Sequence, residues 1–238
     1  KSFVCAGDWG TGRHAEPSVS ITKQALTGKP GLFVGLGDYS YSSAKAFDPV
    51  YTQIKAAKIP SIWTHGNHDG NDYLTYFGQK SWTFAYEAGD VVFVCLDGNS
   101  SGASNATVLD NALKTSKAKW RIVFIHQPMH SPSSSHGDDA CKCASVIKPL
   151  LTKYKVQLVL QGHNHIYGHT PPTANSTTFV LAGTGGESPY SIGATNGFVA
   201  TSQGQGFLRG DIGANSITCK FMDKSGAVKD SFTIPDWT

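Results

Sequence analysis

The sequence has little charge, few cysteines and no long apolar run. Charged residues make up 16% of its 238 residues and the formal net charge is +3, which is too small and too scattered to favour nucleic-acid binding. No apolar run approaches the roughly 20 residues that span a bilayer, and the chain begins in strand-like sequence, so we expect no membrane segment and expect that any leader has been removed or never existed. With 39% hydrophobic residues, the chain can bury the core of a single domain over residues 1–238.

Cysteine is scarce, and five copies are an odd number, so at least one thiol is free or pairs outside the chain. Cys5, Cys95 and Cys219 lie in apolar strand-like segments, where we expect small buried hydrophobes. Cys141 and Cys143 are separated by one residue and could form a local disulfide, belong to two separate bridges, or hold an incidental metal ion. We favour the local disulfide.

Three triplets match the acceptor pattern for N-glycosylation, although a chain rich in Ser and Thr contains such triplets by chance. They begin at Asn99, Asn105 and Asn175. Together with the low charge, they favour a secreted, extracellular glycoprotein. The sequence does not predict an oligomeric state.

The first third of the chain alternates strand-like apolar runs with segments of helical spacing. We predict strands over 2–6, 31–36 and 59–64, separated by helices over 18–26 and 44–57. Such βαβ alternation indicates parallel strands joined by right-handed crossovers.

The pattern changes from Trp82 onward. A hairpin is predicted over 84–96 about a Gly-Asp turn, and helices over 107–116 and 144–154 are each followed by a strand, at 121–125 and 156–160. After His169 the sequence consists of short strands and glycine-rich turns, which favours a second, more antiparallel sheet packed on the first. The expected fold class is α/β, a four-layer αββα sandwich of two mixed β-sheets flanked by helices.

Metal-ligand residue types recur directly after these strand-like runs. Parallel strands present their C-terminal loops to one crevice, so ligands at successive strand ends can converge there. Carboxylates, imidazoles and an amide suit iron, zinc or manganese rather than a thiolate zinc site. The candidate ligands are Asp8, Asp38, Tyr41, Asn67, His126, His163 and His165.

This set is large enough for two ions that share one carboxylate. Asp38 is the natural bridge, since it has two oxygens and a central place in the order of motifs. The spacing of His163 and His165 sends both imidazoles to one side of an extended segment, so each can bind a different ion. The glycines before Asp8, Asp38, Asn67 and His163 let the backbone turn sharply. Each motif alone is weak; their joint occurrence in order predicts a dimetal site.

At these motifs the chain resembles the calcineurin-like metallophosphoesterase superfamily and, within it, the purple acid phosphatases. Most of the superfamily begins with Asp-x-His, whereas here Gly10 stands two residues after Asp8. Purple acid phosphatases supply the missing ligand with a tyrosine three residues after the bridging aspartate, and Tyr41 stands three after Asp38. The resemblance extends through a glycine-rich strand at 181–186 and implies the metallophosphoesterase fold.

The resemblance also implies a ligand assignment and a reaction. Asp8, Tyr41 and His165 would hold Fe(3+), and Asn67, His126 and His163 would hold a divalent Zn, Fe or Mn ion, with Asp38 bridging the two. The implied activity is that of an acid phosphatase, which hydrolyses small phosphate monoesters by attack of a metal-activated hydroxide at a dinuclear Fe(III)–M(II) centre.

Histidines in the loops of the motifs are the candidates for contacting substrate. The resemblance implies His68 as a catalytic residue that contacts substrate together with Asn67, and a second histidine in the loop after His126. His136 fits that place better than His130, and both are kept as substrate-binding candidates, with the proton donor left open.

Two rival functions remain. One is a phosphodiesterase or nuclease on the same dimetal core, and the other is a secreted metal-binding protein with little turnover. Because nothing ahead of Asp8 resembles the extra β-domain of the plant-type enzymes, we expect the small single-domain form.

Overall fold

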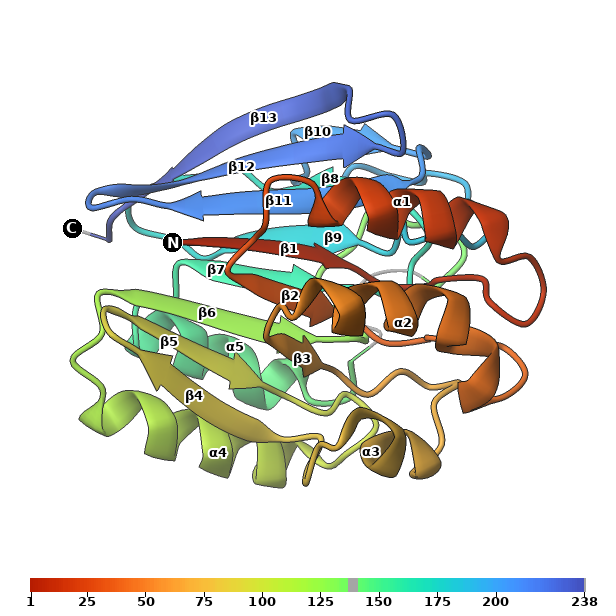
Figure 1. Ribbon diagram of the computed structural model, residues 1–238. Coiled ribbons are helices and arrows are strands. Elements are labelled where there is room, and N and C mark those ends of the chain that lie inside the picture. Colours follow the sequence, from red (N-terminus) through yellow and green to blue (C-terminus); the bar gives the residue numbers. More distant parts are fainter. Residues whose placement is uncertain (137–140, 238) are drawn as a thin grey trace.

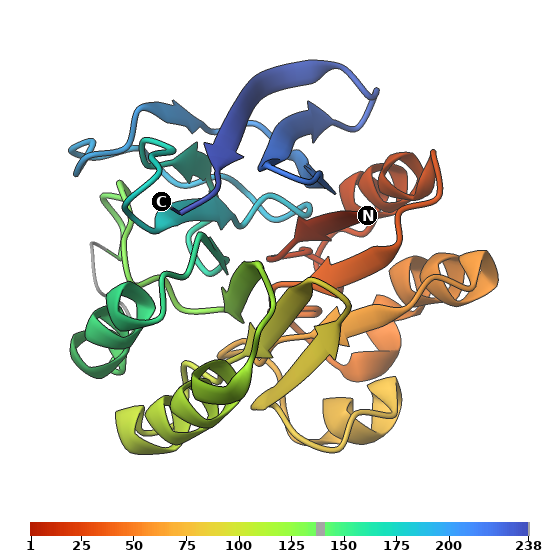
Figure 2. The same ribbon diagram turned by 90° about the vertical axis from the view of Figure 1, so that its left-hand side faces the viewer.

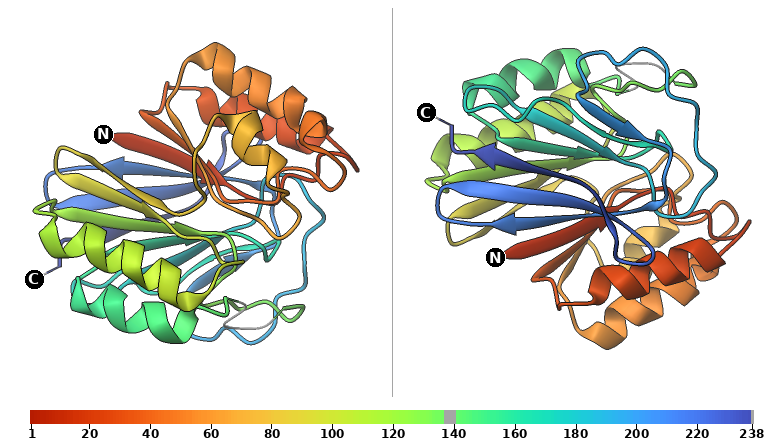
Figure 3. Two further views of the ribbon diagram at one scale, coloured as in Figure 1. Left: turned by 90° about the horizontal axis from the view of Figure 1, so that it is seen from below. Right: turned by 90° about the horizontal axis from the view of Figure 1, so that it is seen from above.

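Two β-sheets face each other and carry helices on their outer faces in the computed structural model, which describes residues 1–136 and 141–237 (Figure 1). Seen from below and from above, the red and orange helices of the N-terminal part of the chain lie on one side of the paired sheets, and the green helices lie on the other (Figure 3). The predicted four-layer αββα class is confirmed.

The first sheet has six strands in the order β13-β12-β11-β1-β2-β3. Strands β1, β2 and β3 pair in parallel, and β11, β12 and β13 extend the sheet beyond β1 by antiparallel pairing. The bounds of these strands are β1 Ser2–Ala6, β2 Leu32–Gly35, β3 Ser61–Trp63, β11 Gly206–Ile212, β12 Ser216–Asp223 and β13 Val228–Pro235.

The second sheet has seven strands in the order β10-β8-β9-β7-β6-β5-β4. Its centre is parallel, from β5 through β6 and β7 to β9, and both margins are antiparallel. The bounds are β4 Phe84–Ala88, β5 Val91–Cys95, β6 Trp120–Ile125, β7 Leu158–Gln161, β8 Tyr167–His169, β9 Thr178–Ala182 and β10 Ala200–Ser202.

The C-terminal strands do not form a separate antiparallel sheet, and that part of the sequence prediction is wrong. β8, β9 and β10 join the second sheet, whereas β11, β12 and β13 join the first. Apolar periodicity predicts a strand but does not say which sheet an antiparallel strand joins.

The helices divide between the two outer faces (Figures 1 and 2). α1, α2 and α3 cover the first sheet, and α4 and α5 cover the second. The predicted helix over 44–57 begins as a short 3₁₀ turn because Pro49, which has no N–H, stands in the first turn of α2. Their bounds are α1 Glu16–Leu26, η1 Ala44–Phe47, α2 Asp48–Ala57, α3 Asp72–Phe77, α4 Gly102–Thr115 and α5 Ala144–Lys153.

Three apolar clusters fill the three spaces between the four layers. Strand β1 shows how the sequence achieves this, because its side chains alternate between the two faces of the sheet. Phe3 and Cys5 point into the core between the sheets, whereas Val4 and Ala6 point toward α1 and α2. A strand buried on both faces must be apolar throughout, which explains the continuous apolar runs.

The cysteines pair as the sequence predicts, whereas one of the three glycosylation triplets is buried. Cys141 and Cys143 form a disulfide, while Cys5, Cys95 and Cys219 are buried and free. Asn105 is 0% exposed and its Nδ2 donates to the Asp97 carbonyl at 2.7 Å, so its triplet is inaccessible in the folded chain. Within the described ranges, no helix has the length and apolar character needed to cross a bilayer.

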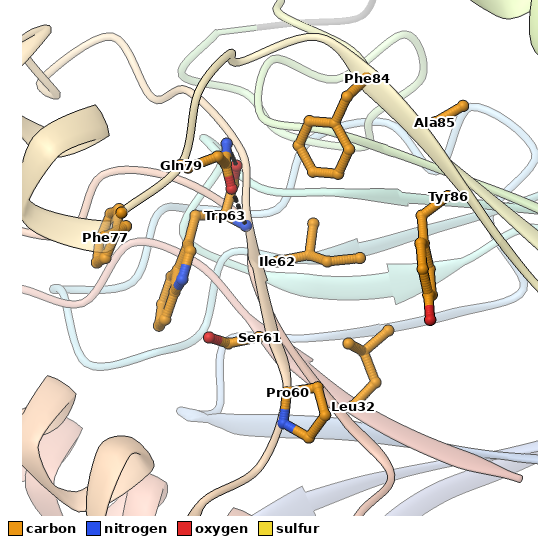
Figure 4. Close-up of a pocket in the computed structure, with 11 residues that line it drawn as sticks. Leu32, Pro60, Ser61, Ile62, Trp63, Phe77, Gln79, Phe84, Ala85 and Tyr86 are labelled. Atoms are coloured by element: carbon orange, nitrogen blue, oxygen red, sulfur yellow. Dashed lines mark hydrogen bonds between the residues drawn. The ribbon is translucent and has the colours of Figure 1, made fainter.

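An apolar pocket of about 380 Å³ lies between the edge strands β3 and β4 (Figure 4). The rings of Trp63 and Phe77 stack beside it with centroids 4.2 Å apart. Gln79 accepts from the Trp63 N–H at 3.3 Å and donates to the Trp63 carbonyl at 2.9 Å, so it covers the exposed edge of β3. Strand edges line this pocket, and the loops that carry the candidate ligands do not.

The core between the sheets should dominate stability. Phe124 on β6 is fully buried there and its ring stacks on Phe93 at 5.7 Å. We expect Phe124→Ala to lower the free energy of unfolding by about 3–5 kcal/mol, measured by urea denaturation. Tyr86→Ala is the control, since that ring is 57% exposed and its loss should cost roughly 0.5 kcal/mol or less. Equal losses would contradict this assignment of the core.

Candidate metal centre

The candidate ligands all lie at the C-terminal ends of parallel strands. Asp8 follows β1, Asp38 and Tyr41 follow β2, and Asn67 follows β3 in the first sheet; His126 follows β6, and His163 and His165 follow β7 in the second. Backbone hydrogen bonds join the strand ends of the two sheets, from the Gly7 N–H to the Ala182 carbonyl at 2.9 Å and from the Gly185 N–H to the Gly7 carbonyl at 2.7 Å. The two sets of loops therefore share one edge of the sandwich.

One group of ligand atoms surrounds the Asn67 amide oxygen. His163 Nδ1 lies 2.8 Å and His126 Nε2 3.2 Å from Asn67 Oδ1, and His126 Nε2 lies 3.3 Å from Asp38 Oδ2. Ligand atoms of Asp38, His126 and His163 all lie within 4.8 Å of one another. These four side chains are spaced to hold one ion.

A second group contains Asp8, Tyr41 and His165. His165 Nε2 lies 3.2 Å from Tyr41 Oη and 3.4 Å from Asp8 Oδ1. The other oxygen of Asp8, Oδ2, accepts from the His163 N–H at 2.8 Å and so links the two groups. Asp8 Oδ1 is buried and accepts no hydrogen bond from the described residues.

That unpartnered carboxylate oxygen fits a cation. A buried carboxylate oxygen without a hydrogen bond is costly unless an ion neutralises it. Aimed at Tyr41 Oη and His165 Nε2, Asp8 Oδ1 completes an oxygen- and nitrogen-rich donor set of the kind that iron or zinc prefers. Asp38 contacts His126 in the first group, and its role as a bridge to the second stays a prediction.

Three ligands adopt strained backbone conformations. Asp8, Asp38 and His163 have φ angles of 60°, 51° and 69°, in the left-handed region that non-glycine residues rarely occupy. Such strain concentrates at functional sites, where the surrounding structure compensates for it. The segment of His163 and His165 is therefore a tight bend and not the extended segment predicted from the sequence.

The glycines beside the ligands mainly allow close approach. A Cβ on Gly66 would lie 2.2 Å from the Asp38 nitrogen, and a Cβ on Gly162 would lie 2.6 Å from the Leu36 carbonyl oxygen. Among the four glycines that precede ligands, only Gly37 has a positive φ, of 85°. The sharp turning that was expected of these glycines is performed largely by the ligands themselves.

Hydrogen bonds fix the two most buried imidazoles among the candidate ligands. His126 Nδ1 lies 2.5 Å from the Leu36 carbonyl and His165 Nδ1 lies 2.9 Å from the Ser188 carbonyl, so each Nδ1 donates and each Nε2 faces the other ligands. Tyr190 stacks on His165 with ring centroids 4.0 Å apart. Such contacts orient imidazoles for metal binding.

Asp69 is a positioning residue that the sequence reasoning missed. Its Oδ2 accepts the N–H groups of Asp38 and Gly66, both at 2.8 Å, and its Oδ1 accepts the N–H of Tyr39 at 3.0 Å. These bonds hold the loop of Asp38 in its left-handed conformation. The only sequence signal was that Asp69 ends the Gly-Asn-His-Asp motif.

Electrostatics at the first group favour an ion pair before any metal binds. Burial opposes charge on Asp38, but the charge and hydrogen bond of His126 and the His68 N–H outweigh it and lower the Asp38 pKa to about 2. Burial likewise opposes charge on His126, but Asp38 outweighs it and raises the His126 pKa to about 10. Burial and the charge of His126 lower the His163 pKa to about 4.

Tyr41 retains its proton in the same metal-free protein. Burial raises the pKa of its phenol, and the negative charges of Asp8 and Asp38 raise it further. A bound cation inverts this effect, because a nearby positive charge favours the phenolate.

The loop histidines occupy different places. The ring of His68 lies 4.7 Å from that of Tyr41, and the ring of His136 lies 4.6 Å from that of His163, so both border the ligands. His130 packs instead on Phe179 and Phe198, at 5.8 and 5.3 Å, which favours a structural role over the predicted contact with substrate.

Residues 1–167 match the sequence profile of the calcineurin-like phosphoesterase family. The chain belongs to this family. It is distantly related to the purple acid phosphatases: purple acid phosphatase 4 of Arabidopsis thaliana is 30% identical over 123 residues, covering 50% of this chain and 36% of that protein. Tartrate-resistant acid phosphatase type 5 of Oryctolagus cuniculus is 24% identical over 289 aligned positions, covering 94% and 87%. The chain spans about a third of the length of the first curated relatives it matches.

Solved structures share the fold of this calcineurin-like phosphoesterase. Purple acid phosphatase PPD1 from yellow lupin superposes with a TM-score of 0.81 at 19% identity, covering 99% of this chain and 53% of that one. A dimetal phosphatase from Danio rerio has a TM-score of 0.73 at 14% identity, covering 100% and 99%. At these identities the likeness concerns the fold alone.

Replacing Asp69 should weaken metal binding without removing a ligand. In Asp69→Asn an amide N–H₂ takes the place of one oxygen and faces backbone donors, so the Asp38 loop should relax. We expect affinity for Zn²⁺ to fall by about 10- to 100-fold, measured by competition with a chromophoric chelator. Asp72→Asn, an exposed neighbour at the start of α3, is the matched control; equal affinity in the two variants would contradict the role of Asp69.

Metal binding at the first group should release protons. At pH 7 His126 is protonated in the metal-free protein, since its pKa is about 10, and a metal ion needs the neutral imidazole. Affinity should therefore rise by about 10-fold per pH unit below that pKa. Calorimetry in buffers of different ionisation enthalpy measures the protons released, and His126→Gln should release about one fewer. A pH-independent affinity would show that His126 is not a ligand.

Proposed function

We propose that this chain is an acid phosphatase that hydrolyses phosphate monoesters at a dinuclear Fe(III)–M(II) centre. The observation that carries the proposal is the pairing of two ligand groups, one of which sets Tyr41 Oη 3.2 Å from His165 Nε2 beside the unpartnered Asp8 Oδ1. A phenolate and a carboxylate are hard anionic donors that suit a trivalent ion.

The proposed ligands divide between the ions as the two groups do. Asp8, Tyr41 and His165 hold Fe(3+), and Asn67, His126 and His163 hold a divalent ion of zinc, iron or manganese, with Asp38 shared between them. When bound, two such cations acidify water and neutralise phosphate oxygens.

The chain's own groups supply orientation and protons. His68 lies next to Tyr41 in one ligand group, and His136 lies next to His163 in the other. Protonated, either imidazole can donate to a phosphate oxygen or to the leaving oxygen as its bond to phosphorus breaks. A requirement for a protonated donor favours activity at acid pH.

We also propose that the protein is secreted and acts outside the cell. The Cys141–Cys143 disulfide supports this, because disulfides persist in oxidising compartments. Asn175 is an exposed acceptor for a glycan; Asn99 is exposed too, but its Nδ2 donates to the Gly66 carbonyl at 3.1 Å.

Tyr41→Phe tests the ferric assignment. Wild-type holoprotein should absorb visible light by charge transfer from phenolate to iron, and the variant should lose this band because it has no phenol oxygen. Hydrolysis of p-nitrophenyl phosphate at acid pH should fall by about 100-fold or more, since metal ions contribute several kcal/mol to such reactions. Tyr51→Phe, a change on α2 away from the ligands, should retain colour and activity.

Other results would decide against the proposal. A colourless dizinc or dimanganese protein that hydrolyses bis-p-nitrophenyl phosphate faster than the monoester would indicate a phosphodiesterase or nuclease. A coloured protein that is inert toward monoesters across acid pH would indicate a metal-binding protein with little turnover.

A further inference from the structure

Arg13 lies against the outer ligand Tyr41. Its guanidinium carbon is 4.3 Å from the centroid of the Tyr41 ring, in cation–π contact. The turn that carries Arg13 is tied to the loop of Tyr41, because the Thr11 carbonyl accepts from the Tyr41 N–H at 2.9 Å and from Ser40 Oγ at 3.1 Å. The fold therefore places the backbone of this turn beside the Tyr41 loop.

Most of the hydrogen-bonding capacity of Arg13 is unused. A guanidinium carries five N–H donors in a planar fork. Within the described part of the chain, its acceptor is Glu187, whose Oε2 lies 3.4 Å from Arg13 Nη1, and 55% of the Arg13 side chain is exposed. The Glu187 carboxylate is 4% exposed and also receives the Ser188 N–H at 2.8 Å. A long bond to an already partnered carboxylate leaves Arg13 free to bind an anion.

Arg13 and His68 both border Tyr41. The His68 ring centroid lies 4.7 Å from that of Tyr41 and the Arg13 guanidinium carbon lies 4.3 Å from it, so both side chains pack on the same phenol ring. His68 is itself exposed. A leaving group that extends across the Tyr41 ring therefore comes within reach of the Arg13 guanidinium.

We propose that Arg13 is a specificity-determining residue that binds a second oxyanion, a phosphate or a carboxylate, attached close to the leaving oxygen of the substrate. Its planar fork matches either oxyanion in a bidentate way. In the hydrolysis, a bond forms between a water oxygen and phosphorus, the bond from phosphorus to the leaving oxygen breaks, and that oxygen takes up a proton. Arg13 contacts only the leaving fragment. This inference rests on the proposed phosphatase function.

A matched pair of substrates tests the inference in the holoprotein. 2-Carboxyphenyl phosphate has a carboxylate beside the leaving oxygen, phenyl phosphate lacks it, and pyrophosphate offers a second phosphate. Arg13→Gln should lower kcat/KM for the two charged-leaving-group substrates by about 10- to 100-fold, mainly through KM. The loss on phenyl phosphate should be at least about ten times smaller. Arg13→Lys should recover only part of the loss, since it keeps the charge without the fork.

The outcomes separate the possible roles of Arg13. Selective loss on both charged substrates supports a general oxyanion site, and selective loss on pyrophosphate alone supports a phosphate site. Equal loss on all three substrates would overturn the proposal and leave Arg13 as a partner of Glu187 and Tyr41. Arg209→Gln, which removes an arginine paired with Asp211 on β11, is the control for a general change of charge.

A binding measurement keeps this inference distinct from the phosphatase proposal. Methylenediphosphonate is not hydrolysed, so its affinity relative to inorganic phosphate can be measured by calorimetry even if the protein turns over no ester. Preferential binding that Arg13→Gln reduces by about 10-fold or more supports the oxyanion site in an active or inactive protein. An unchanged ratio, with metal content equal to wild type, would refute it.

Discussion

The candidate centre depends on the way Asp8 ties together loops from both sheets. Its N–H donates to the Gly37 carbonyl after β2, its carbonyl accepts from the Glu187 N–H, and its Oδ2 accepts from the His163 N–H after β7. Three of its four polar atoms therefore hold neighbouring loops. Only Oδ1 is left, and it points toward Tyr41 and His165. This single residue, held at a φ of 60°, joins the loops of the two sheets and directs one free oxygen at the other ligands.

Charge makes this arrangement costly without a cation. Asp8 and Asp38 are both buried. His126 lies 3.3 Å from Asp38 and His165 lies 3.4 Å from Asp8, so each carboxylate is offset only while its histidine carries a proton. Burial of an uncompensated carboxylate is unfavourable, and the strained backbone at both aspartates adds to the cost. The loops withstand it because Asp69 and the backbone bonds of Asp8 hold them in place. Preorganisation of this kind means that an ion does not have to gather its ligands when it binds.

Much of this structure follows from local sequence patterns, and the remainder depends on contacts between distant segments. Strands buried on both faces, such as β1, must be apolar throughout. A polar residue that directly follows such a run, such as Asp8, can therefore be recognised from the sequence as a candidate ligand. The partition of β8 and β11 between the two sheets is decided by tertiary pairing, which no local pattern records. The contact of Asp69 with the Asp38 loop joins segments 31 residues apart, and that of Arg13 with Glu187 joins segments 174 apart. No local pattern predicts either contact, although Asp69 does end the Gly-Asn-His-Asp motif.

The backbone around position 10 leaves no room for a histidine side chain. Most of the superfamily has histidine there, but a Cβ on Gly10 would lie 2.8 Å from His14 Nε2 and 3.1 Å from the Glu187 Cα, and its φ is 68°. The segment of Glu187 thus occupies the space that a side chain at position 10 would need. That same segment carries the Ser188 carbonyl and the Tyr190 ring that orient His165. Tyr41 enters the second ligand group from the loop after β2. The tyrosine ligand therefore accompanies a backbone that leaves no room for a side chain at position 10.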